Sequence, residues 1–178
     1  MNGTDVSFGT LSLKTIVVHT GTYFVMGLLA VVFLDYAHMF AQAEYRVFMR
    51  QLNDPFVAAG PLFQPIRGFL FAVAFFPIRQ TLFGMKRGWG VIWLLLVVLG
   101  VLSTFGPSPG SIEGLIYTNR PIRLQLVALP EVFIQSLLLS SILYYWVNHP
   151  TNRKLSWSMY ILFGISVVAS ILGVALIY

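Results

Sequence analysis

Ser103–Gln135, STFGPSPGSIEGLIYTNRPIRLQLVALPEVFIQ, is the stretch in which an otherwise apolar sequence becomes rich in Gly, Pro and charge. It begins with a Gly/Pro segment, residues 106–123, and then returns to an apolar run that carries a single carboxylate, Glu131. Further apolar runs of roughly 20 residues lie on both sides, a length that a bilayer core of about 30 Å explains. We interpret the stretch as a polar loop followed by the start of a membrane-spanning helix.

The composition supports a membrane protein. Hydrophobic residues make up 57% of the 178 residues and charged residues only 10%, whereas soluble domains usually carry about 25% charge. We therefore predict an all-α, multi-pass integral membrane bundle that forms one domain over residues 1–178. The net charge of +5 is carried by single or paired residues beside apolar runs. This pattern favours membrane lipids as partners and argues against nucleic acid.

About five segments are predicted to span the membrane: residues 15–35, 62–83, 89–106, 124–147 and 157–178. The second is ambiguous, because Arg67 and Arg79 leave eleven uncharged residues between them, about 16 Å of helix. Either both arginines reach opposite interfaces and the segment spans, which is the favoured alternative, or a shorter piece kinked at Pro77 is buried against its neighbours.

Residues 36–60 are amphipathic, with Phe40 and Val47 near one helical face and Arg46 and Arg50 on another. We expect an interfacial helix that ends at Asp54-Pro55, because the residue before proline disfavours the α conformation.

Five spans would place the two ends of the chain on opposite sides of the membrane. The side of the N-terminal end would carry six basic residues and the other side five. The positive-inside rule then places the N-terminus in the cytoplasm, and a bacterial cell membrane is the expected location.

Glu131 is the sharpest functional signal, because a carboxylate inside an apolar helix costs about 3 kcal/mol at mid-membrane unless it is paired or hydrated. Arg67 is the predicted partner, and Gln135 lies one turn along the same face. Pro130 inside the helix would free a carbonyl and indicate a kink beside a cavity. The alternatives are a structural Arg–Glu clamp and a glutamate that lies at the interface because its helix starts later.

The predicted topology brings other polar residues to the same outer mouth, where we expect a binding pocket. Besides Arg67, Glu131 and Gln135, its predicted members are Asp35, His38, Gln64, Glu113, Arg120 and Arg123. The loop GPSPGSIEG could present backbone N–H groups as an anion-binding nest, or it could be a rigid tight turn.

Neither a metal nor a cofactor is predicted. The chain has no cysteine, so Cys-ligated metals and thiolate nucleophiles are excluded. His19 and His38 are nineteen residues apart, about 28 Å along one helix, and no H-x-x-x-H, nucleophile-elbow or P-loop motif occurs.

These features favour a small membrane protein with an outward-facing polar pocket that binds or transports a small solute or a lipid. The alternative is a non-catalytic accessory subunit that docks another membrane subunit or a second copy of the chain. An intramembrane enzyme that uses Asp35, His38, Glu113 or Glu131 as acid and base is the least favoured hypothesis.

Overall fold

The computed structural model describes residues 5–177, and this part of the chain is helical without strands. Three helices are long and apolar enough to span a membrane: Phe8–Phe33, Ile122–Asn148 and Arg153–Ile177. They correspond to the first, fourth and fifth predicted spans. The predicted total of about five is not confirmed.

Helix α1 (Phe8–Phe33) begins before the predicted residue 15, because Ser7 caps it by accepting a hydrogen bond from the Thr10 N–H. A capping hydroxyl satisfies one of the unpaired N–H groups of the first turn. At the other end, Asp35 adopts a left-handed conformation with φ of 47°. It turns the chain into α2.

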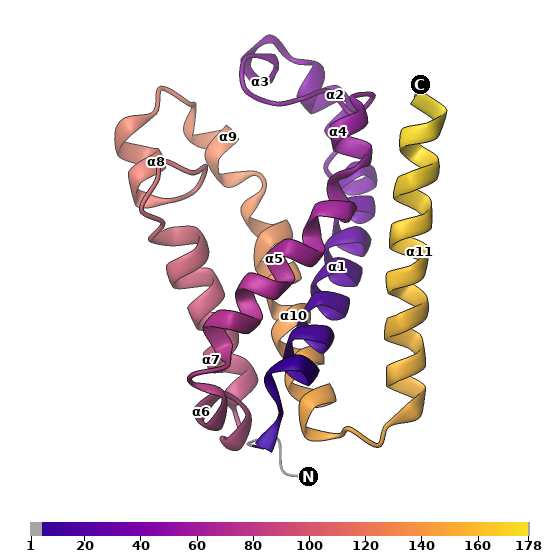
Figure 1. Cartoon of the computed structure of the whole chain (residues 1–178). Coiled ribbons are helices and arrows are strands. Elements are labelled where there is room, and N and C mark those ends of the chain that lie inside the picture. The colour runs from indigo at the N-terminus through magenta and orange to yellow at the C-terminus, as the bar shows by residue number, and fades with distance from the viewer. Residues whose placement is uncertain (1–4, 178) are drawn as a thin grey trace.

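The predicted span 62–83 is broken rather than continuous. Helix α5 (Gly60–Phe75) ends near Pro77, and α6 (Arg79–Gly84) follows as a separate helix. The continuous span that the sequence favoured is therefore not observed. The alternative, an interruption at Pro77, is observed. Gly68 brings α5 against α1, because a Cβ there would lie 2.7 Å from the Ile16 Cα; Figure 1 shows the two helices crossing.

The predicted span 89–106 consists of α7 (Gly88–Leu94) and a π-helix, η2 (Leu95–Leu102). The wider π-turn explains why the Ser103 N–H bonds to the Val98 carbonyl, five residues back. In Figure 1 this arm diverges from α5 on its way to α8 (Ile112–Tyr117). Helix α8 lies inside the predicted Gly/Pro loop 106–123.

Residues 36–58, which we name the cover segment, contain three short helices instead of the one predicted: α2 (Tyr36–Ala41), α3 (Ala43–Arg46) and α4 (Pro55–Ala58). Asp54-Pro55 begins a helix rather than ending one. Asp54 accepts a hydrogen bond from the Phe56 N–H, and proline fits the first helical position because its missing donor is not needed there.

The segment Ile122–Asn148, which corresponds to the fourth predicted span, consists of α9 (Ile122–Leu126) and α10 (Leu129–Asn148), separated by two turn residues at 127–128. Pro130 lies in the first turn of α10. Its missing N–H is therefore not needed within α10, and the helical segment is interrupted at residues 127–128, beside the cavity, rather than bent inside α10.

The interior is unevenly filled along the bundle. The main cluster of buried residues packs α1, α6, α7 and the end of α10 together, and includes Leu82, Phe83, Leu143 and Trp146. A smaller cluster, Phe40, Tyr45 and Leu124, joins the cover segment to α9. In Figure 1, α6 and α7 of the main cluster lie at the opposite end of the molecule from α2, α3 and α9 of the smaller one, and α11 (Arg153–Ile177) runs along one side.

Candidate functional site

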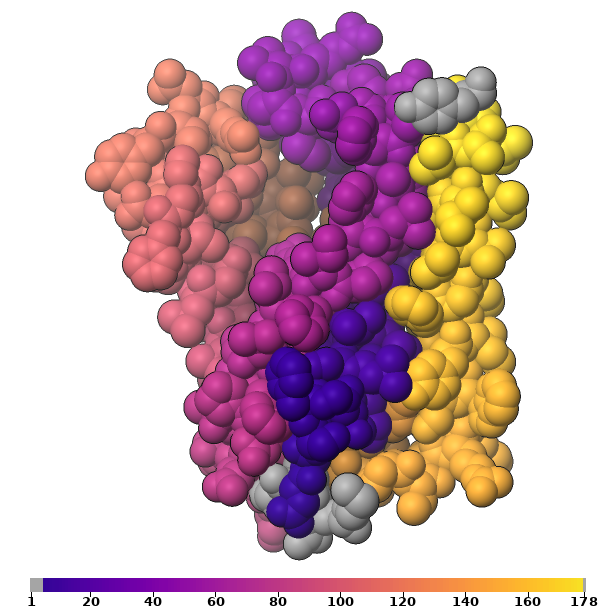
Figure 2. Space-filling view, viewed as in Figure 1, coloured from indigo at the N-terminus to yellow at the C-terminus, as the bar shows by residue number. Residues whose placement is uncertain are grey.

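A partly open cavity of about 900 Å³ lies beneath the cover segment. Its wall is completed by the second half of α1, the start of α5, the junction of α9 and α10, Pro109 and Arg120 of the Gly/Pro loop, and Ala169, Ser170 and Gly173 of α11. Figure 2 shows a hollow at this end of the molecule, between α5 and the salmon-coloured segment around α8. Cavities of this size hold drug-sized or larger ligands in other proteins.

The wall of the cavity is mainly apolar. Large side chains from α1 and the cover segment include Phe24, Leu28, Phe40, Phe48, Met49 and Leu52. Gly27 adds open space, because a Cβ at this position would meet no atom within 4 Å. The few polar groups on such a wall fix the orientation of a ligand.

Glu131 lies on this wall, and its hydrogen-bond donor is the hydroxyl of Tyr36. Tyr36 is held in place by its ring, which stacks on Phe40 with 4.8 Å between centroids. Burial, together with the hydrogen bond to Glu131, raises the pKa of the Tyr36 phenol. The phenol thus stays protonated, and its hydroxyl can donate a hydrogen bond to the carboxylate.

The predicted Arg67–Glu131 ion pair is not formed. Arg67 lies over the Phe71 ring, 5.6 Å from its centroid, and is absent from the cavity wall. Within residues 5–177, the ion pairs are Arg50–Asp54 and Arg123–Glu44, each at 2.8 Å. The prediction that Glu131 needs a partner led to the wrong residue, because the cover segment folds over α10 and brings Tyr36 to it.

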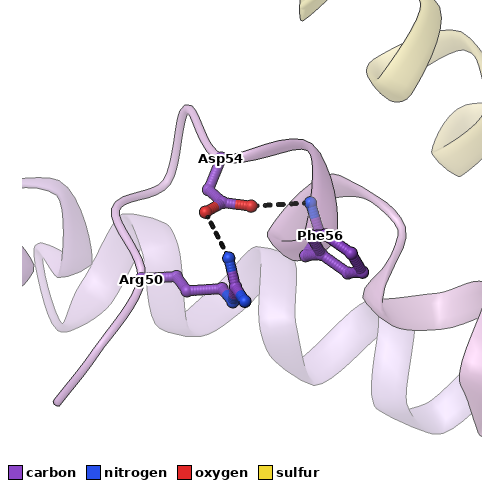
Figure 3. Close-up of polar contacts among 3 residues, drawn as sticks. All are labelled: Arg50, Asp54 and Phe56. Carbon is purple, nitrogen blue, oxygen red and sulfur yellow. Dashed lines mark hydrogen bonds and ion pairs between the residues drawn. The ribbon is translucent and has the colours of Figure 1, made fainter.

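Arg50 also lines the cavity, and its positive charge is paired with the carboxylate of Asp54. Its guanidinium lies 2.8 Å from the Asp54 carboxylate and over the Phe56 ring at 4.6 Å. Figure 3 shows that Asp54 accepts hydrogen bonds from both Arg50 and the Phe56 N–H. These hydrogen bonds, from Arg50 first, lower the pKa of Asp54.

Arg120 also lines the cavity, but no carboxylate of the described chain lies within ion-pair distance of it. Its guanidinium is held over the Phe48 ring, 4.0 Å from the centroid. Its carbonyl accepts a hydrogen bond from the Gln125 side chain at 3.2 Å. Arg120 and Glu131 are the two members of the predicted pocket that the structure brings to one cavity.

Three other predicted residues lie elsewhere. Gln64 is buried between α5 and α1, where its Oε1 lies 3.0 Å from His19 Nε2. Gln135 is half-buried on α10, away from the cavity wall. Arg123 is exposed and pairs with Glu44, which ties α9 to the cover segment.

Asp35, His38 and Glu113 do not reach the cavity either. Asp35 is exposed and caps α2 by accepting from the His38 N–H at 3.4 Å. Glu113 lies in the first turn of α8. The predicted convergence of all these groups at one mouth is therefore not observed.

Part of the Gly/Pro loop, residues 108–114, forms a turn closed by its own hydrogen bonds. Ser111 donates its N–H to the Ser108 carbonyl, and the Ser111 hydroxyl accepts from the Gly114 N–H at 2.9 Å. These hydrogen bonds have the form of the tight-turn alternative.

Sequence reasoning missed Tyr36, Phe48 and Gly27 as members of the cavity. The available signal was the amphipathic pattern of residues 36–60, which places Tyr36 and Phe40 one turn apart on the apolar face. Among residues 5–177 there is also no group of three or more His, Asp or Glu that could hold a metal ion. Comparisons of this chain with protein-family models, curated proteins and solved structures found no match.

Proposed function

We propose that this chain is a multi-pass integral membrane protein that binds a lipid-like amphipathic molecule in the cavity beneath the cover segment. The observation that carries the proposal is the cavity itself, about 900 Å³ with a largely apolar wall and a carboxylate held by a tyrosine. It adjoins helices long and apolar enough to span a membrane.

The apolar wall favours a lipid over a small polar solute. Burial of hydrocarbon contributes about 0.8 kcal/mol per CH₂ group, so a chain lying against Phe24, Leu28 and Leu52 would supply most of the affinity. A polar solute would leave this surface without a complementary contact. The charged groups would then position the polar head of the lipid.

The proposal can be tested by filling the cavity. In Gly27→Phe, the new ring would enter open space on the cavity wall. Gly164→Phe is the matched control, because Gly164 is also half-buried on a long helix, meets no atom within 4 Å and lies away from the cavity. Each variant would be purified in detergent, and co-purified lipid would be measured by native mass spectrometry.

We expect bound lipid to fall by about tenfold or more in Gly27→Phe, and to stay at the wild-type level in Gly164→Phe. Equal lipid content in all three proteins would contradict the proposal. If, in addition, a second polypeptide co-purifies from native membranes, the accessory-subunit alternative gains support. Transport of the bound molecule stays a prediction that flux measurements in vesicles would test.

A further inference from the structure

The cavity wall carries two opposite charges that have no ionic partner in the described chain. Glu131 receives a hydrogen bond from a neutral hydroxyl, and Arg120 lies over an aromatic ring. Arg50 differs, because Asp54 matches its charge. Glu131 and Arg120 are not paired with each other, since they form no contact within the 4.0 Å of an ion pair.

Charges beside apolar surfaces are stable when an opposite charge or hydrogen bonds compensate them. We propose that the ligand of this cavity is a zwitterionic amphiphile, an inference that rests on the proposed function. Its protonated primary amine donates hydrogen bonds to the Glu131 carboxylate. Its phosphate diester accepts hydrogen bonds from the Arg120 guanidinium, and its hydrocarbon chains lie against the aromatic and aliphatic wall.

The neighbours of both charged groups leave them able to bind such a head group. Tyr36 donates to the Oε2 atom of Glu131, so the Oε1 atom has no protein partner in the described chain and can accept from an ammonium. Phe48 holds the Arg120 guanidinium without neutralising it. Charge-assisted hydrogen bonds at both ends are stronger than neutral ones and require both charges on one ligand.

The first test compares three head groups in the wild-type protein. The protein is reconstituted in nanodiscs that contain equal amounts of phosphatidylethanolamine, phosphatidylcholine and phosphatidylglycerol with identical acyl chains. Lipids retained after release into detergent are measured by native mass spectrometry. We expect phosphatidylethanolamine to be enriched about tenfold over phosphatidylglycerol, which lacks the amine, and less strongly over phosphatidylcholine, whose quaternary ammonium lacks N–H donors.

Two variants separate the contributions of the charges. Glu131→Gln keeps an oxygen for the Tyr36 hydroxyl but loses the charge, so the preference for phosphatidylethanolamine over phosphatidylglycerol should disappear. Arg120→Gln should lower the retention of both lipids while leaving their ratio unchanged. Arg46→Gln is the control, because Arg46 is exposed on the cover segment and lies away from the cavity wall.

Water-soluble phosphoethanolamine distinguishes a lipid from a free zwitterion. We expect millimolar phosphoethanolamine to leave the retained lipid unchanged, because it lacks the hydrocarbon chains. If it displaces the lipid, a free solute is the ligand and the lipid assignment is overturned. Retention without head-group preference, or an unchanged preference in Glu131→Gln, overturns the zwitterion inference. The proposed function would then still be decided separately by Gly27→Phe.

Discussion

The two ends of the bundle accommodate a charged side chain in opposite ways. At the packed end, Lys14 is only 7% exposed, yet its Nζ donates to the Trp146 carbonyl at 2.8 Å and lies 5.3 Å from the centroid of the Trp146 ring. At the cavity end, Glu131 has Tyr36 on one side and empty space on the other. A charge enclosed by close packing stabilises the fold, whereas a charge beside a cavity is available to a ligand.

The largest effect should follow from breaking the packed end. Trp146 is 1% exposed and belongs to the main cluster. Trp146→Ala would leave a cavity and remove the ring over Lys14, so we expect a loss of about 4 kcal/mol in the free energy of unfolding. Denaturant unfolding in detergent micelles measures it. A loss below about 1 kcal/mol would contradict the conclusion that the end around Trp146 is closely packed and stabilises the fold.

Replacing one glycine on α5 and one on α1 by alanine compares the effect of one added methyl group in a closely packed contact with its effect on the cavity wall. In Gly68→Ala the added Cβ would lie 2.7 Å from the Ile16 Cα, and we expect a loss of about 3 kcal/mol, since backbone atoms cannot move aside easily. In Gly27→Ala the same methyl group meets nothing within 4 Å, and alanine favours the helix by up to about 1 kcal/mol. Thermal unfolding of both variants should shift in opposite directions, and similar shifts would contradict the prediction.

The contact between the cover segment and α10 should have an intermediate effect. Tyr36→Phe removes the donor to Glu131, and we expect a loss of about 1.5 kcal/mol because the hydrogen bond has a carboxylate acceptor. Hydrogen exchange of residues 36–46 should become faster while the amides of α6 and α7 keep their rates.

Tyr145→Phe is the matched control for this variant. Tyr145 is 46% exposed, and its only hydrogen bond to a side chain within the described residues is made by its backbone carbonyl, with His149. Removal of the Tyr145 hydroxyl should leave both stability and exchange unchanged. Equal effects of the two substitutions would show that the Tyr36 hydroxyl does not fasten the cover segment.

Hydropathy alone predicted the helices whose apolar runs are long. The runs at 15–35, 124–147 and 157–178 became the helices that are long enough to span, because an uninterrupted apolar segment has few alternatives to a helix. The interruption at Pro77 was recognised, but its outcome depended on how closely α5 could approach α1. That approach is set by Gly68 and Ile16, which lie 52 positions apart in the sequence.

The candidate site was less predictable, because its geometry depends on a segment without a strong pattern. Glu131 stood out as a lone carboxylate, but Tyr36 reaches it only because Asp35 turns the chain back over α10. A left-handed residue leaves no hydropathy signal, so Arg67 at a similar expected depth was the better guess from sequence. The partner of Glu131 follows from tertiary structure alone.

The smallest expected effect concerns pH at the edge of the cover segment. The hydrogen bond from Arg50, with that from the Phe56 N–H, lowers the pKa of Asp54 from its ordinary value of 3.8. Asp54 therefore binds a proton at a higher pH in the unfolded segment than in the folded one. The contribution of its hydrogen bonds to the stability of the cover segment is complete above the ordinary pKa of 3.8, and it is lost as the pH falls below 3.8. We therefore expect the protection of the α4 amides against hydrogen exchange, measured relative to their intrinsic rates, to be lower below pH 3.8 than at pH 6.

Asp54→Asn separates this effect from general acid unfolding. Asparagine keeps an oxygen that can cap α4 but does not titrate, so the protection of α4 should be lower than in the wild type at pH 6 and should change little on acidification. Because Asp54 lies at the solvent-exposed edge, salt should reduce the wild-type effect as well. If α4 lost protection together with α6 and α7 in both proteins, the response to acid would be an unfolding of the whole protein. The cavity end would then be no more sensitive to pH than the packed end.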